Sequence, residues 1–172
     1  MSVTVPRARV ASMVMMVWSL TAAAALFAQG ADQPVDLATF PRTSLEITAH
    51  GARGAPQHKY PFDVWVADTE PRAEQGLMFV RDLPESMGMV FPLEPPRIER
   101  MWMKNTYVEL DMLFVGSDGR ISKIIEHATP LSLALLSSDT PVAAVVELKG
   151  GEAGKLGLKV GDNVSWQKPA LH

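Results

Sequence analysis

The chain has 172 residues and no cysteine. Disulfide bonds, thiol catalysis and a lipid-modified N-terminal cysteine are therefore excluded. Histidine is scarce as well, and His50, His58, His127 and His172 are scattered without the spacing of a zinc motif. The sequence also lacks a phosphate-binding glycine loop, a dinucleotide-binding fingerprint and a nucleophile elbow. We therefore expect no cofactor, and no short motif points to a reaction class.

Residues 1–30 contain no acidic residue and have the pattern of a secretory signal. Arg7 and Arg9 form a short positive start, and the next nineteen residues carry no charge and end in small side chains. This pattern predicts a signal peptide, with Ala28 and Gly30 at the −3 and −1 positions of the cleavage site. The apolar run is nearly long enough to span a bilayer, so an uncleaved N-terminal anchor is the alternative. In either case we expect a periplasmic or secreted domain.

Positive charge is too sparse for a nucleic-acid-binding protein. The chain has 16 Lys and Arg against 19 Asp and Glu, and two of the basic residues, Arg7 and Arg9, belong to the leader. From Ala31 onward the net charge is therefore 14 minus 19, or −5. Because nucleic-acid binding needs a concentrated basic face, we expect no nucleic-acid partner. Contact with a membrane is expected only through the N-terminal segment, if that segment is not cleaved.

Residues 31–43 are polar and interrupted by proline, which predicts a tether in front of one domain over residues 44–168. Within this domain, turn signals separate short apolar or alternating stretches that are typical of strands. The predicted fold class is α+β, a compact, mostly antiparallel, barrel-like β-sheet of about seven or eight short strands with two short helices. We expect helices at residues 70–75 and 150–157, and strands at residues 44–49, 60–67, 89–91, 98–104, 111–115, 121–126, 142–148 and after Gly161-Asp162. The stretch "PLEPPR", residues 92–97, is expected to interrupt the strands.

The stretch "MWMKNTYVELDMLF" holds most of the candidate site residues. If residues 98–104 and 111–115 form an antiparallel hairpin, Lys104 lies directly opposite Asp111. One interpretation is a structural cross-strand ion pair, with Asn105 and Thr106 serving the loop through side-chain hydrogen bonds. The other is a ligand site, because a carboxylate inside an apolar run is costly to bury unless it is paired. The ligand-binding candidates are Arg81, Trp102, Lys104, Asn105, Thr106 and Asp111.

Methionines are concentrated in one part of the chain after the leader. Six of the ten fall between Met78 and Met112, and they include two Met-x-Met pairs, Met87 with Met89 and Met101 with Met103. Both thioethers of such a pair point to one face of a strand, and soft thioethers select Cu(I). Methionine is also an adaptable core residue, which is the simpler interpretation. Copper binding is therefore a minor alternative, and no metal is expected.

Several ordered motifs resemble the UPF0127 family, also called domain-of-unknown-function family 192 (DUF192). They are Gly76-Leu77-Met78, Gly88-Met89 ahead of Phe91, Trp102-Met103-Lys104-Asn105-Thr106, Leu110-Asp111 and Gly161-Asp162. The resemblance covers residues 62–166 and implies a small, β-rich domain. It implies no established activity and no catalytic residue, so only the place of residues 102–111 in the family pattern is carried over. The chain departs from that pattern at residues 131–138, where "LSLALLSS" is unusually apolar.

Taken together, these features predict a non-enzymatic accessory or binding domain of the cell envelope. Its expected partner is a small polar molecule or an envelope protein. The alternative is an envelope hydrolase or lyase that uses Asp111 and Lys104. The two differ in what they need, because an enzyme requires both side chains to face one accessible pocket, whereas a binding domain needs only a groove with an aromatic lining.

Overall fold

The computed structural model describes Met1 and residues 36–50 and 57–167. The predicted signal segment lies outside the described residues apart from Met1. In the described part of the chain, no helix has the length and apolar character needed to cross a membrane. All of the elements below belong to one compact unit, Pro34–His172.

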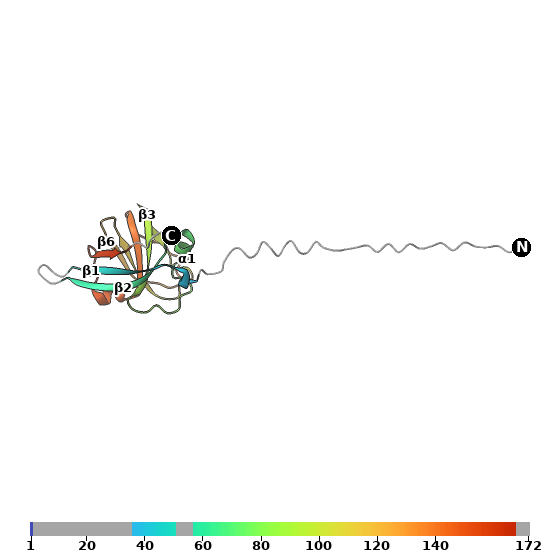
Figure 1. Ribbon diagram of the computed structural model, residues 1–172, viewed down its shortest axis with the longest axis horizontal. Helices are drawn as coiled ribbons and strands as arrows, with labels where there is room; N and C mark the ends of the chain where they lie inside the picture. The colour runs from blue at the N-terminus through green and yellow to red at the C-terminus, as the bar shows by residue number, and fades with distance from the viewer. Residues whose placement is uncertain (2–35, 51–56, 168–172) are drawn as a thin grey trace. The chain divides into compact units, whose positions relative to one another are not determined.

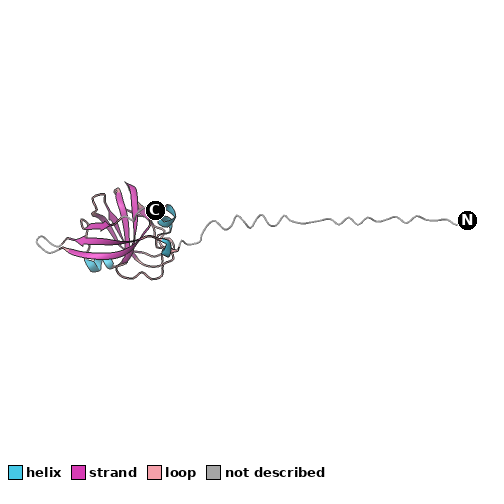
Figure 2. Cartoon of the chain, viewed as in Figure 1, coloured by secondary structure: helices cyan, strands magenta, loops and turns pink. Residues whose placement is uncertain are grey.

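A seven-stranded sheet forms most of this unit (Figures 1 and 2). Its strand order is β6-β5-β8-β3-β2-β1-β9, and every neighbouring pair is antiparallel except β2 with β3. The strands are β1 (Arg42–Ala49), β2 (His58–Val66), β3 (Met87–Arg97), β5 (Leu110–Val115), β6 (Ile121–Ala128), β8 (Val142–Lys149) and β9 (Asn163–Trp166). A second, two-stranded sheet joins β4 (Arg100–Met101) to β7 (Leu136–Ser137). The helices are short: η1 (Leu37–Thr39), α1 (Glu70–Gln75) and α2 (Glu152–Leu156). The α+β class with a mostly antiparallel sheet is thus confirmed.

Elements that depend on local sequence signals form where they are predicted. Strands β1 and β2 pair as an antiparallel hairpin, with Leu45 opposite Phe62. Helix α1 covers the predicted residues, has a proline in its first turn, and ends at Gly76 with a φ of 50°. A positive φ favours glycine because it lacks a Cβ atom, and this explains the stop.

Three boundary predictions are wrong. The tether predicted to reach Thr43 already contains η1, the buried side chain of Phe40 and the start of β1. Strand β3 continues through the proline-rich stretch to Arg97, because its pairing with β8 is irregular there and the exposed residues 94–97 tolerate proline. The stretch 98–104 contributes only the two-residue strand β4, which pairs with β7 rather than with β5.

The main sheet curls but is not closed into a barrel. Its edge strands β6 and β9 approach each other at one end, where Arg120 and Asn163 form an isolated antiparallel bridge. The backbone N–H of Ile121 also donates to the carbonyl of Asp162 at 2.9 Å. The sheet is therefore barrel-like in its curvature, but it is not a closed barrel.

Apolar side chains cover both faces of the sheet and form two separate cores. Strand β5 shows the division, because Leu113 and Val115 belong to the first core while Met112 and Phe114 belong to the second. Successive side chains of a strand point to opposite faces, so a strand that is buried on both faces is expected to be apolar at every position. The two exceptions on the central strands, Asp111 and Glu147, are for this reason the residues that need an explanation.

Candidate functional site

Asp111 is fully buried and accepts backbone hydrogen bonds. Its Oδ1 atom accepts from the N–H groups of His127 at 2.9 Å and Gly151 at 3.0 Å, and its Oδ2 atom accepts from Ala153 at 2.8 Å. These contacts tie β5 to the end of β6 and to the first turn of α2. Backbone N–H groups at a helix start have no intrahelical partner, so the carboxylate satisfies them. Asp111 is therefore an internal structural anchor of the domain.

Lys104 does not pair with Asp111. Its exposed ammonium lies 5.2 Å from the ring centroid of Trp102, whereas Asp111 faces the first core beneath α2. The predicted hairpin fails because β5 pairs with β6 and β8, and β4 lies in the other sheet. The two groups on which the hydrolase or lyase alternative depends are thus not brought together.

The remaining candidates gather where three loops meet. The N–H of Phe79 donates to the carbonyl of Asn105 at 2.8 Å, and the N–H of Leu131 donates to the carbonyl of Thr106 at 3.1 Å. A third bond joins the N–H of Met103 to the carbonyl of Ser132 at 3.0 Å. These bonds fix residues 77–81, 102–107 and 129–135 to one another.

Each of the three loops contains one residue with an unfavourable backbone angle. The φ values are 67° for Phe79, 55° for Asn105 and 62° for Leu131. Asparagine tolerates this left-handed region, but phenylalanine and leucine adopt it at a cost. Strained residues of this kind concentrate at functional sites, where the surrounding structure holds them in place.

The three loops display a set of large apolar side chains to solvent, which we call the aromatic–leucine surface. Its members are Phe79, Trp102, Tyr107, Leu131, Leu133 and Leu135, each at least 40% exposed. The rings of Phe79 and Tyr107 contact edge to face with centroids 6.4 Å apart. The guanidinium of Arg81 lies 4.7 Å from the centroid of the Tyr107 ring, and the ammonium of Lys104 lies over the ring of Trp102 at 5.2 Å. Two of the three aromatic rings on this surface are therefore each paired with a cation.

Asn105 and Thr106 support this surface from inside the loop. The Nδ2 atom of Asn105 lies 3.9 Å from the sulfur of Met78, and the buried hydroxyl of Thr106 donates to the carbonyl of Lys104 at 3.3 Å. Thr106 thus makes a side-chain to backbone bond of the predicted kind, whereas the side chain of Asn105 contacts another side chain. Of the six sequence candidates, the structure thus brings five together and places Asp111 elsewhere.

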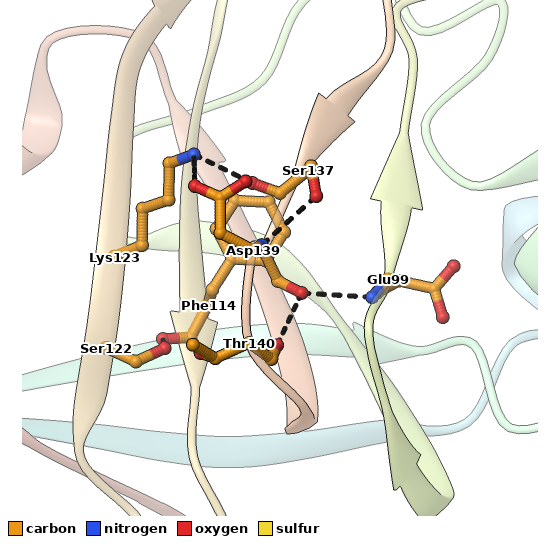
Figure 3. Close-up of polar contacts among 8 residues, drawn as sticks. Glu99, Phe114, Ser122, Lys123, Ser137, Asp139 and Thr140 are labelled. Carbon is orange, nitrogen blue, oxygen red and sulfur yellow. Dashed lines mark hydrogen bonds and ion pairs between the residues drawn. The ribbon is translucent and has the colours of Figure 1, made fainter.

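Polar contacts hold residues 137–140, which follow the loop that carries Leu131, Leu133 and Leu135, as Figure 3 shows. The ammonium of Lys123 on β6 contacts the carboxylate of Asp139 at 2.6 Å and the carbonyl of Ser137 at 2.8 Å. The hydroxyl of Ser138 donates to the carbonyl of Thr140 at 2.7 Å and accepts from the N–H of Glu99 at 3.0 Å. The segment that presents Leu131, Leu133 and Leu135 is therefore fixed at both ends.

Glu147 on β8 is a second buried carboxyl group, which the sequence analysis missed. It is 4% exposed, and burial raises its pKa to about 8. Its neighbours across the sheet are Met89 on β3 and Met112 on β5. Among the residues that the structure describes, none donates a hydrogen bond to this carboxyl group or forms an ion pair with it. The signal available in the sequence was one acidic residue inside the apolar run "VAAVVEL".

The two predicted Met-x-Met pairs both pack into the second core. Met89 and Met103 are fully buried there, and Met87 and Met101 pack against the core from its edge. Met112 joins them, so five of the six methionines that follow the leader lie in one cluster. No group of three or more His, Asp or Glu side chains within the described ranges could hold a metal ion.

His127 lies at the end of β6, close to Asp111, and is exposed. Its Nδ1 atom is 2.8 Å from the Oε2 atom of Glu109, and this hydrogen bond raises the pKa of the imidazole. The carboxylate that faces His127 is thus Glu109 on the preceding loop, and not its sequence neighbour Glu126. This agrees with the expectation that adjacent strand residues point apart.

Comparisons with known proteins identify the family but no activity. A crystal structure of a "putative transcription regulator" from Sinorhizobium meliloti 1021 is similar at 37% identity and a TM-score of 0.67, over 74% of this chain and 95% of the other. A protein of unknown function from Novosphingobium aromaticivorans DSM 12444 is similar at 35% identity and a TM-score of 0.69, over 86% of this chain and 100% of the other. No curated protein matches the chain. The family model of DUF192, described as "Uncharacterized ACR", matches residues 53–166, and the chain therefore belongs to this family.

Proposed function

We propose that this protein is a non-enzymatic binding domain of the cell envelope, and that its partner is a protein segment with both apolar and acidic side chains. The segment would bind on the aromatic–leucine surface. One observation carries the proposal: three strained, mutually hydrogen-bonded loops hold large apolar side chains in solvent. A fold that only needed stability would bury these side chains.

The composition of this surface favours a protein over a small polar molecule as the partner. Tryptophan, tyrosine and arginine are the residues most enriched at the energetic centres of protein interfaces. Here Trp102, Tyr107 and Arg81 lie on two adjoining loops, and three exposed leucines extend the apolar area. Contiguous exposed apolar patches on soluble domains mark interaction sites.

The charge of the surface indicates what the partner carries. Neither Arg81 nor Lys104 forms an ion pair within the described part of the chain, although each lies over an aromatic ring. Acidic side chains on the partner would find both cations available, and complementary charge speeds association and sets its register.

A location in the envelope rests on the predicted signal segment. The acidic net charge expected for residues 31 onward does not support a nucleic-acid partner, so the description of the Sinorhizobium relative as a "putative transcription regulator" is not carried over. We therefore place the partner among exported proteins or the exposed segments of membrane proteins.

Site-specific photocrosslinking in the native host tests this proposal. A photoreactive phenylalanine analogue is introduced at Leu133, and a control analogue at Ser117, which lies in the turn at the opposite end of β5. We expect one discrete crosslinked product from position 133 that is weakened by Trp102→Ala and by Arg81→Ala, with no such product from position 117. Equal products from both positions, or a product that is unaffected by both substitutions, would refute the proposal.

A further inference from the structure

Glu147 lies in a row of three side chains that plays no part in the proposed binding surface. Met89 is its partner on β3 and Met112 is its partner on β5, so the three residues follow one another across adjacent strands. Directly opposed side chains share one face of a sheet, with Cβ atoms about 4.5–5.5 Å apart. Both methionines are fully buried and belong to the second core.

The carboxyl group has no partner in this setting. The flanking thioethers are only weak acceptors and have no hydrogen to donate. The other members of the second core are hydrocarbon or aromatic side chains, together with Met103. Glu147 keeps only a slight exposure of 4%. A carboxylate in such an apolar setting without a counter-charge is disfavoured, and a bound proton or cation would stabilise it.

We propose that Met89, Met112 and Glu147 form a binding site for a soft monovalent cation, namely Cu(I), in the core that also contains Met103. Thioethers are soft ligands and favour Cu(I), whereas carboxylates alone suit hard cations such as Mg²⁺. One carboxylate neutralises one monovalent cation, which leaves the loaded site without net charge in an apolar core. A divalent ion would leave an uncompensated positive charge there.

The rest of the methionine cluster fits this assignment. Met87 and Met101 are partly buried and pack against the same core. Flexible methionine side chains can rearrange around an ion at low cost. A site made of thioethers also suits an exported protein without cysteine, since it cannot be lost to disulfide formation.

Metal competition on the purified full-length protein tests the proposal. Cu(I), and Ag(I) as its soft redox-inert analogue, are titrated against a colorimetric Cu(I) chelator, and Zn(II) serves as the hard control. The variants are Met89→Leu, Met112→Leu and Glu147→Gln. Met78→Leu is the matched control, because Met78 lies in the loop beside Asn105.

We expect one Cu(I) per chain, sulfur and oxygen neighbours in the X-ray absorption spectrum, and no retention of Zn(II). Affinity should fall at least tenfold in each of the three site variants and stay unchanged in Met78→Leu. The leucine variants nearly conserve volume, so they should fold even if Glu147→Gln does not. No binding at one equivalent, or binding that Met89→Leu and Met112→Leu leave unchanged, would overturn the proposal.

Discussion

The Oδ2 atom of Asp111 accepts a hydrogen bond from the backbone N–H of Ala153 at 2.8 Å, and this contact fixes the first turn of α2 to strand β5. Together with the bonds from His127 and Gly151, it satisfies three backbone groups with one buried carboxylate. The residue that the sequence marked as a site candidate is thus a centre of stability.

Replacing Asp111 by alanine should therefore be costly. The substitution leaves three N–H groups without their acceptor, and we expect the free energy of unfolding to fall by about 3–5 kcal/mol. Lys104→Ala is the control, because an exposed cation that lies over a ring contributes about 1 kcal/mol or less. Urea denaturation measures both, and equal losses would contradict the anchor role.

Replacing Leu131 by glycine should stabilise the folded protein. Its φ of 62° is unfavourable for leucine by about 1–2 kcal/mol, whereas glycine adopts it freely but gains about 0.5–1 kcal/mol of entropy in the unfolded chain. Leu133→Gly is the matched control, since Leu133 is also an exposed leucine, at 68% against 55% for Leu131, and is not among the residues with positive φ. We expect the free energy of unfolding of Leu131→Gly to exceed that of Leu133→Gly by at least about 1 kcal/mol, as measured by thermal unfolding.

Glu147 should make stability depend on pH. Burial raises its pKa from the usual 4.5 to about 8, so the folded protein holds this proton more tightly than the unfolded chain does. The favourable contribution of the protonated form is fully present below pH 4.5 and is lost as the pH rises through 8. Each pKa unit corresponds to about 1.4 kcal/mol, so several kcal/mol are at stake.

The variant Glu147→Gln isolates this effect, because an amide does not titrate. Denaturation across pH 4–9 should show a smaller loss of stability in the variant than in the wild type over the interval between the two pKa values. Parallel curves for the two proteins would show that Glu147 titrates normally. The metal-free protein must be used, since a bound cation would replace the proton.

The mature chain should begin near Ala31. The positive start, the uncharged run and the small residues at positions 28 and 30 together predict cleavage there. N-terminal sequencing of protein from the native host, combined with fractionation, measures this directly. A chain that begins at Met1 or Ser2 and stays with the membrane would instead show a retained anchor, and recovery from the cytoplasm would remove the envelope from the proposed function.

The features that could be predicted from the sequence depend on neighbouring residues. Helix α1 was predicted residue for residue because Pro71 favours its start and Gly76 ends it. The β1–β2 hairpin followed from the alternation of apolar side chains in two adjoining stretches. The sequence analysis also listed Arg81 together with residues 102–106 as candidates for one site. It did not predict that the loop at residues 129–135 joins them.

The features that only the tertiary structure decided depend on distant pairing. Strand β5 is buried along its whole length on both faces, so its sequence could not show that it pairs with β8 rather than with residues 98–104. The acceptor role of Asp111 required Ala153, which is 42 residues away, and the isolation of Glu147 required Met89 and Met112 on two other strands. Burial and hydrogen bonding are properties of the assembled sheet. For this reason only the structure showed that Asp111, the candidate from the sequence, is a structural anchor, and that Glu147 is a buried carboxyl group without a partner among the described residues.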